Sequence, residues 1–298
     1  MISVIIPTRN RPELLFRLVN VLETILDTDY EIIIVDSSDS DKCFSERYNR
    51  SKIKYHLTNV RSAAAQRNIG LELSGVSMYT FFLDDDVLPN PDYFKRSISA
   101  LVETKSIGIS GVAINSQKSV VREMPKGLSG LFRRVFLLDS NCDGVVLRSG
   151  INIPVRSQSL KRIKTEWLIG CSGWQTEKIG ATRFESDFQG QSLAEDVIFS
   201  VKMRNFGELV TDTSIVLEHE ESEIERPGGR EFWKMWIENR HRLVHVLRSD
   251  KPNHFGFWWA TLGQVIILAY AKIRRKNYKQ GSFLGIVDGV NSIIKGNA

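Results

Sequence analysis

Three consecutive carboxylates, Asp84, Asp85 and Asp86, directly follow an apolar stretch at residues 79–83. Adjacent carboxylates repel one another, so a folded chain usually places a cation beside them. Oxygen ligands on alternate residues of an extended segment suit Mg²⁺ or Mn²⁺ bound together with the phosphates of a substrate. The alternative is a solvated turn, because aspartate is common in turns and residues 89–91 read Pro-Asn-Pro.

The segments before these acids predict a parallel sheet. Residues 2–7 and 31–36 read as buried strands, and residues 13–26 between them place apolar side chains at helical spacing. A strand–helix–strand order with apolar strands is typical of an α/β fold. A further strand is predicted at 53–57 and a further helix at 63–73.

The loops after the first two strands form the predicted binding crevice. Ligands bind beyond the carboxyl ends of such strands, which brings Pro7-Thr8-Arg9 and Asp36 to a shared position. Neither loop contains GxGxxG or GxxxxGK[ST], the common sequences that cradle phosphates. A ligand at this crevice is therefore held in another way.

Composition limits the class of protein. The chain has 298 residues, of which 42% are hydrophobic and 25% charged, which is typical of a folded protein and not of a disordered or collagen-like one. Residues 226–298 hold 13 Lys and Arg against 4 Asp and Glu, whereas residues 1–225 hold 27 against 31. A mildly acidic body with a basic C-terminal part differs from a uniformly basic fold that binds nucleic acid, so no nucleic-acid partner is expected.

The cysteines and the beginning of the chain suggest a cytoplasmic protein. The three cysteines, Cys43, Cys142 and Cys171, are odd in number and form no CxxC pair, which argues against a disulfide framework and a structural zinc site. Residues 1–4 run into a predicted strand with no basic segment before it, so no signal peptide is expected.

The C-terminal part combines an apolar run with a basic cluster. A long helix is predicted at 229–249, and the 17 residues at 255–271 carry no charge. This length is at the lower limit for spanning a bilayer. The cluster that follows (Lys272, Arg274, Arg275, Lys276 and Lys279) suits a helix lying on an anionic inner leaflet. The alternative is a helix packed on the rest of the protein or at a homodimer interface.

Four blocks of the chain resemble family 2 glycosyltransferases of the GT-A fold. The first block is residues 3–11 together with 34–36, and the second is residues 65–75, which are similar to the family's ARNxGxxxAxG with Gln66 inside it. The third is Asp84-x-Asp86, which is similar to the DxD motif. The fourth is Glu195-Asp196, with Gly170, Gly180 and Arg204 around it, which is similar to the "ED" region. The blocks follow one another in the family's order from residue 1 to about 220.

The resemblance implies residues that bind the substrate. Pro7, Thr8, Arg9 and Asp36 would hold the base and ribose of a nucleotide, and Arg67 would line the same pocket. Asp84 and Asp85 would lie on the substrate side of the acidic motif, with Asp84 facing the ribose or the metal.

The resemblance also implies a metal site and a base. Asp86 would ligate the divalent cation, Mg²⁺ or Mn²⁺, that bridges the donor diphosphate, and His219 would be a second ligand. The alternative for His219 is a surface histidine among glutamates. Asp196 would be the catalytic base, with its neighbour Glu195 as the alternative.

The implied fold is a Rossmann-like, mostly parallel sheet flanked by helices. We expect a GT-A catalytic domain at 1–225, with the nucleotide-sugar site in 1–110 and the acceptor side and base in 111–225. We expect a membrane-associating helical extension at 226–298. Trp174 is a candidate for stacking on a sugar, with core packing as the alternative.

The predicted activity is metal-dependent, inverting transfer of a hexosyl-type sugar. The donor would be a nucleotide-diphosphate sugar, and the acceptor a hydroxyl of a glycan or a polyprenyl-diphosphate-linked molecule. The setting would be polysaccharide or O-antigen synthesis at the inner face of the cell membrane. A sugar nucleotidyltransferase is one alternative. That class has a Gly-rich loop with Lys or Arg after the first strand, which Pro7-Thr8-Arg9 does not supply. A catalytically inactive nucleotide-sugar-binding protein is another, and the intact Asp84, Asp86 and Asp196 argue against it.

Overall fold

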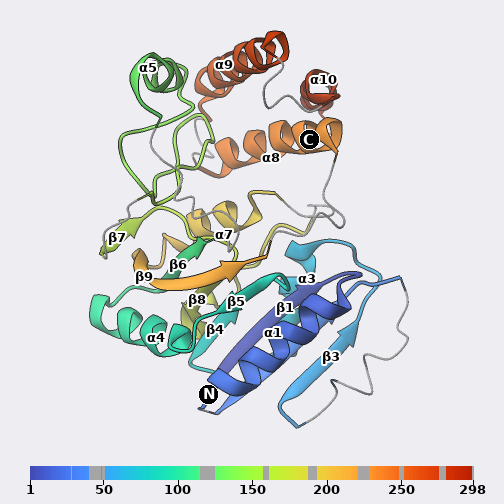
Figure 1. Ribbon diagram of the computed structural model, residues 1–298, viewed down its shortest axis with the longest axis vertical. Coiled ribbons are helices and arrows are strands. Elements are labelled where there is room, and N and C mark those ends of the chain that lie inside the picture. Colours follow the sequence, from blue (N-terminus) through green and yellow to red (C-terminus); the bar gives the residue numbers. More distant parts are fainter. Residues whose placement is uncertain are drawn as a thin grey trace. The chain divides into compact units, whose positions relative to one another are not determined.

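The structure is a computed structural model that describes residues 1–27, 29–39, 48, 51–114, 125–156, 161–186, 193–220, 228–247, 252–274 and 280–296. The chain forms two units. The first comprises residues 1–121 and 157–224, and the second comprises residues 122–156 and 225–298. Figure 1 shows the chain and labels most of its helices and strands.

The first unit is built on a mixed sheet, which has nine strands within the described ranges, in the order β3-β2-β1-β4-β8-β6-β9-β5, with β7 paired to β9. The strands are β1 (Ile2–Thr8), β2 (Tyr30–Asp36), β3 (Ile53–Leu57), β4 (Tyr79–Phe82), β5 (Val87–Pro89), β6 (Gly108–Ile114), β7 (Arg162–Thr165), β8 (Ser172–Gln175) and β9 (Leu209–His219). The helices are α1 (Pro12–Ile25), α3 (Ala63–Leu73), α4 (Tyr93–Thr104), α6 (Thr176–Ile179) and α7 (Glu195–Met203).

The N-terminal half of this sheet is parallel and buried, as the sequence predicts. Every residue of β1 and β2 is buried, because the two strands lie inside the sheet and carry apolar side chains on both faces. β3 lies at the edge and is partly exposed. The predicted strands at 2–7, 31–36 and 53–57 and the predicted helices at 13–26 and 63–73 are confirmed within one or two residues.

The order of the parallel strands fixes where a crevice forms. β1 pairs with β2 on one side and with β4 on the other, and both pairings are parallel. The chain therefore winds in opposite directions on the two sides of β1. Loops that follow the carboxyl ends of strands diverge at such a switch point and leave room for a ligand. Here the loops are those after Thr8 and after Phe82.

Helix α3 lies close against β1 because of one glycine. A Cβ on Gly70 would lie 2.3 Å from Cγ2 of Ile5, so only glycine allows this approach. Ser62 caps the helix, since its Oγ accepts a hydrogen bond from the backbone N–H of Ala65. The close fit brings Gln66 to the carboxyl ends of β1 and β2, and Arg67 to Asp84.

The second half of the sheet is mixed. β8 is antiparallel to both β4 and β6, and β9 is parallel to β6 but antiparallel to β5 and β7. Trp174 on β8 is only 1% exposed and packs edge-on against Phe199. The core alternative for Trp174 is therefore confirmed, and the sugar-stacking role is wrong, because the ring lies inside the hydrophobic core.

The second unit is helical. It contains α5 (Gly127–Val135), α8 (Gly229–Leu247), α9 (His254–Ile273) and α10 (Ser282–Ile294). Ile237, Val244, Phe257, Leu268 and Ile286 form its core, which lies among α8, α9 and α10. Close backbone approach of α10 to α8 needs a glycine, because a Cβ on Gly285 would lie 2.1 Å from the carbonyl oxygen of Arg230.

Residues 125–156, which we expect from the sequence to lie on the acceptor side of the catalytic domain, pack with the C-terminal helices. Phe136 stacks on Trp259 with 4.6 Å between ring centroids, and the Trp259 indole N–H donates to the carbonyl of Val135. Lys118 and Arg122, two basic residues of the expected acceptor segment, lie outside the described residues.

Candidate active site

The three consecutive acids lie at the switch point, and their side chains have different surroundings. Asp84 is partly exposed, whereas Asp85 is 5% and Asp86 8% exposed. They follow β4 directly, so the strand order of the sheet places them beside the loop after β1. Asp85 and Asp86 share Arg11 as a partner, but each of the three acids also has a partner that the others lack: Arg67 for Asp84, Thr8 for Asp85 and His219 for Asp86.

Asp85 is held by the loop after β1. Its Oδ2 accepts a hydrogen bond from the Thr8 hydroxyl at 2.7 Å, and its Oδ1 lies 2.9 Å from NH1 of Arg11. Burial raises the pKa of Asp85 to about 6, although the guanidinium of Arg11 and the Thr8 hydroxyl act in the opposite direction. Asp85 thus fixes the loop that the sequence predicts to bind a nucleotide.

Asp86 connects that loop to the end of β9. Its Oδ2 lies 3.3 Å from NH1 of Arg11, and its Oδ1 lies 3.1 Å from Nε2 of His219. β5 and β9 pair with Val87 opposite His219, and the N–H of Glu220 donates to the Asp86 carbonyl at 2.8 Å. The register of these two short strands therefore brings together the two residues that the sequence predicts as metal ligands.

Arg67 of α3 lies between two acids of the site, Asp84 and Glu195. This buried guanidinium contacts Asp84 Oδ1 at 2.6 Å and also pairs with Glu195. The space beside the pair is narrow, because a Cβ on Gly170 would lie 3.2 Å from NH2 of Arg67. Arg67 therefore joins two acids that are separated by 111 residues of sequence.

The thiol of Cys171 also contacts Asp84. The backbone N–H of Asp84 donates to Sγ at 3.5 Å, and Sγ lies 3.7 Å from Oδ2. Burial raises the pKa of the Cys171 thiol well above its ordinary value. The thiol is thus a neutral donor that helps to orient Asp84, not a nucleophile.

Asp196 lies beside Glu195 at the beginning of α7. It lies in the first turn of α7, where its Oδ1 accepts the N–H of Val197 at 2.8 Å. Desolvation by burial raises its pKa to about 6, with Arg67 lowering and Asp84 raising it as smaller influences. An acid with this pKa is deprotonated at neutral pH and can still accept a proton efficiently.

Asp36 lies at the carboxyl end of β2, opposite Thr8 of β1. Its Oδ1 accepts hydrogen bonds from both the backbone N–H and the hydroxyl of Ser38, at 2.7 and 2.5 Å, and its Oδ2 accepts from the Tyr55 hydroxyl at 2.7 Å. The Gln66 amide donates to the carbonyls of Thr8 and Val35, at 2.9 and 2.7 Å. This amide therefore ties the carboxyl ends of β1 and β2 together.

The remaining predicted residues, Pro7 and Arg9, lie at the end of β1 and directly after it. Pro7 is buried in β1 opposite Val35, and Arg9 is partly exposed with a contact of 3.3 Å to Asp39. The structure thus brings Pro7, Thr8, Arg9, Asp36, Asp84, Asp85 and Asp86 to the loops at the carboxyl ends of β1, β2 and β4. Arg67 joins them through Asp84, and His219 joins them through Asp86.

Several residues of the site were not predicted from the sequence. Arg11 contacts both Asp85 and Asp86, and its signal in the sequence is a basic residue two positions after Arg9 of the predicted nucleotide loop. Tyr55 and Cys171 have no local signal, since only the tertiary fold places them beside Asp36 and Asp84. Arg11 and Arg67 also supply positive charge to the acids, so part of the cation that adjacent carboxylates need belongs to the chain itself.

The sequence was compared with protein families and curated proteins. The sequence profile of "Glycosyl transferase family 2" matches residues 3–164. The poly(ribitol-phosphate) beta-N-acetylglucosaminyltransferase TarP of Staphylococcus aureus (strain N315) is 38% identical over 135 residues, which are 40% of each chain. The amylovoran biosynthesis glycosyltransferase AmsB of Erwinia amylovora is 29% identical over 185 residues, or 59% of this chain and 54% of AmsB. The matches thus span about half or less of the length of these relatives.

Solved structures share the fold at low sequence identity. S. aureus TarS 1-349 in complex with UDP-GlcNAc gives a TM-score of 0.57 at 16% identity, covering all of this chain and 81% of that one. GalNAc-T7 with UDP, GalNAc and Mn²⁺ gives 0.64 at 14% identity, covering 99% of this chain and 57% of that one. These likenesses confirm the predicted GT-A fold.

Proposed function

Because the chain belongs to glycosyl transferase family 2, we propose that it transfers a sugar from a nucleotide-diphosphate donor to an acceptor hydroxyl, with inversion at the anomeric carbon. The acceptor would be a glycan or a lipid-linked glycan of a cell-surface polysaccharide. The observation that carries the proposal is the salt-bridge chain from Asp84 through Arg67 to Glu195. It brings the acidic motif to the beginning of α7, where Asp196 lies.

The donor would lie across the switch point. In this proposal Thr8, Arg9 and Asp36 contact the nucleoside, with Gln66 and Asp85 holding their loops. The solved TarS complex contains UDP-GlcNAc, which makes UDP-sugars the first donors to test. Asp85 has protein partners on both oxygens, so its contribution would be to position the nucleotide loop through Thr8 and Arg11.

The residues at Asp86 fit a divalent cation. Two neighbouring ligands of an octahedral Mg²⁺ or Mn²⁺, each at about 2.1 Å from the ion, lie roughly 3 Å apart. Asp86 Oδ1 and His219 Nε2 form a hydrogen bond of 3.1 Å, which is close to this spacing, and the Asp86 carboxylate is a ligand that suits Mg²⁺ or Mn²⁺. Asp86 and His219 would hold the ion. A cation bound here would stabilise the charge that develops on the diphosphate leaving group.

The acceptor would be activated by Asp196. A hydroxyl is a weak nucleophile unless a base removes its proton as the new bond forms. The Asp196 carboxylate would take that proton, while the oxygen attacks the anomeric carbon from the face opposite the diphosphate. One displacement inverts the anomeric centre. Glu195 would keep Arg67 in place and leave proton transfer to its neighbour.

A screen of nucleotide sugars tests the proposal. We expect one donor, used with Mg²⁺ or Mn²⁺, to raise the thermal midpoint of the protein and to be slowly hydrolysed in the absence of acceptor. A donor that binds but is never hydrolysed or transferred would indicate the inactive-binding alternative. Release of diphosphate from a nucleoside triphosphate and a sugar phosphate would indicate a nucleotidyltransferase. Failure of every nucleotide sugar to bind would contradict the proposal itself.

We further propose that α9 rests on an anionic membrane surface. Among the described helices, none is both long and apolar enough to cross a bilayer. One side of α9 is nevertheless exposed and apolar at Phe255, Trp258, Leu262, Ile266, Tyr270 and Ile273, which recur every three or four residues. Lys272 and Arg274 lie exposed at the end of this stripe, whereas Arg275, Lys276 and Lys279 lie outside the described residues. An apolar stripe beside basic side chains suits the boundary of an anionic leaflet.

Binding to vesicles tests the α9 stripe. We expect the full-length protein to bind vesicles rich in anionic lipid at low salt and to be released at high salt, because the Debye length falls to about 3 Å at 1 M. The double variant L262E/I266E should lose this binding, because two carboxylates would enter the apolar layer. V102E is the matched control, since Val102 is also exposed but lies on α4.

A different occupant of the stripe would give a different result. If the wild type ignores anionic vesicles but sediments as a dimer that L262E/I266E dissociates, the stripe is a homodimer interface. Unchanged vesicle binding by the double variant would also contradict the proposal.

A further inference from the structure

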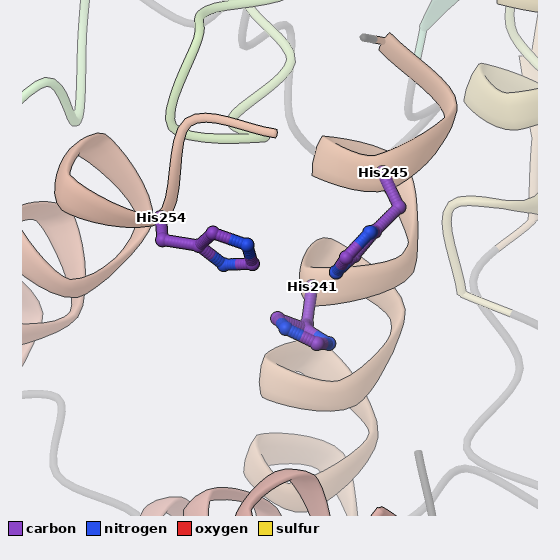
Figure 2. Close-up of side chains that lie close together, drawn as sticks. All are labelled: His241, His245 and His254. Carbon is purple, nitrogen blue, oxygen red and sulfur yellow. The ribbon is translucent and has the colours of Figure 1, made fainter. Parts of the chain in front are cut away.

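Three of the chain's five histidines lie together in the second unit. His241 and His245 are four residues apart on α8, which places them on one face of that helix. His254 is the first residue of α9. Figure 2 shows the three rings turned toward one another, and one nitrogen of each lies within 4.8 Å of the other two.

The three imidazole rings are in contact with one another. The centroids of His241 and His245 are 4.7 Å apart, and those of His245 and His254 are 5.2 Å apart. A neutral imidazole has a free nitrogen lone pair, which is the form that binds metals.

His241 also has an unused polar atom. Its Nδ1 is buried, and no hydrogen-bond partner for it occurs in the described part of the chain. A buried nitrogen without a partner costs about 1–3 kcal/mol, so native proteins seldom keep one without a reason. His245 and His254 are exposed, which leaves their rings free to turn.

We propose that His241, His245 and His254 bind one transition-metal ion, with Zn²⁺ as the best fit. Three imidazoles with a water in the fourth position are an established tetrahedral zinc geometry, with Zn–N distances of about 2.0–2.1 Å. Ligand nitrogens in that geometry lie roughly 3.3 Å apart. The distances between the nitrogens must therefore shorten by at most about 1.5 Å, which rotation of the two exposed rings supplies.

The ion would join two helices. His241 and His245 lie in the C-terminal half of α8, and His254 lies at the beginning of α9. An ion bound to all three would therefore hold the end of α8 to the beginning of α9. Binding only to the folded arrangement stabilises it by mass action. This site is independent of the proposed sugar transfer, because none of its ligands belongs to the acidic motif or to the Asp86–His219 pair.

Zinc binding by the full-length protein tests the site. Protein freed of metal with a chelator is dialysed against Zn²⁺, and bound zinc is counted. We expect the wild type to bind one zinc that H245A and H254A each lose. H56A is the matched control, since His56 lies on β3 in the first unit. D86A should also keep this zinc, which separates the site from the proposed donor-metal site.

Two further measurements guard against a trivial loss of folding. Zinc should raise the thermal midpoint of the wild type by on the order of 5 °C at a hundredfold excess over its dissociation constant, and leave H245A/H254A unmoved. H254C should retain binding, because a thiolate is also a zinc ligand. Equal zinc binding by the wild type and H245A/H254A would overturn the proposal, and so would a wild type that binds none.

Discussion

Replacing Asp196 by asparagine should lower turnover on the order of a hundredfold or more while changing donor affinity little. Asparagine keeps the shape of the side chain but cannot accept a proton from an acceptor hydroxyl. The measurement is kcat for sugar transfer, together with the dissociation constant of the donor. Normal turnover by D196N would show that the base lies elsewhere, with Glu195 the first place to look.

The pKa of Asp196 makes the same role visible in the pH profile of the wild type. This carboxyl group has a pKa of about 6, and only its deprotonated form can act as a base. Activity is therefore present above pH 6, and kcat/KM should fall about tenfold for each pH unit below it. The residual activity of D196N should lack this decline.

Asp85 and Glu195, two other acids of the site, provide the controls for D196N. Asp85 also has a pKa of about 6, so D85N distinguishes the two groups: its acidic decline should persist if Asp196 is the base. E195Q removes the charge that pairs with Arg67 and should mainly weaken donor binding. A dead E195Q beside a nearly normal D196N would move the base to Glu195.

Replacing Asp86 by alanine should abolish transfer. If Asp86 ligates the cation at the diphosphate, its loss removes several kcal/mol of stabilisation of the leaving group, which corresponds to roughly a thousandfold or more in rate. Excess chelator should do the same to the wild type, and Mn²⁺ or Mg²⁺ should restore it. The measurements are the transfer rate and the dissociation constant of the donor with and without the ion.

Variants around Asp86 separate metal binding from folding. Asp86 also contacts Arg11, so D86N, which keeps the shape of the side chain, serves if D86A proves unstable. H219A should weaken the apparent affinity for the metal and regain rate at higher Mn²⁺ concentration. Full activity of the wild type in excess chelator would eliminate the metal role and leave Arg11 and Arg67 as the charges nearest the acids.

The elements of the first unit and the family were accessible from the sequence. The apolar stretches that become β1 and β2 are buried on both faces, so their composition alone distinguishes them from surface strands. The acids after β4 and the Glu195-Asp196 pair are short motifs whose order along the chain carries the resemblance. The uncharged run at 255–271 likewise predicts a helix, and it forms most of α9.

Only the tertiary structure decided which side chains meet. Arg67 contacts both Asp84 and Glu195, and Phe136 packs on Trp259. More than a hundred residues of sequence separate Arg67 from Glu195, and likewise Phe136 from Trp259. Helical or strand periodicity states which way a side chain faces on its own element. It contains no information on which distant element lies opposite.

The same limit explains the histidine cluster. The spacing of His241 and His245 on a helix can be read from the sequence, but the approach of His254 depends on how α9 folds back on α8. The sequence by itself determined the strands, the order of the motifs and the acids available for catalysis. The packing of the folded chain determined the partners and burial of each acid and the raised pKa of Asp85 and Asp196, because electric fields and desolvation act through space and not along the chain.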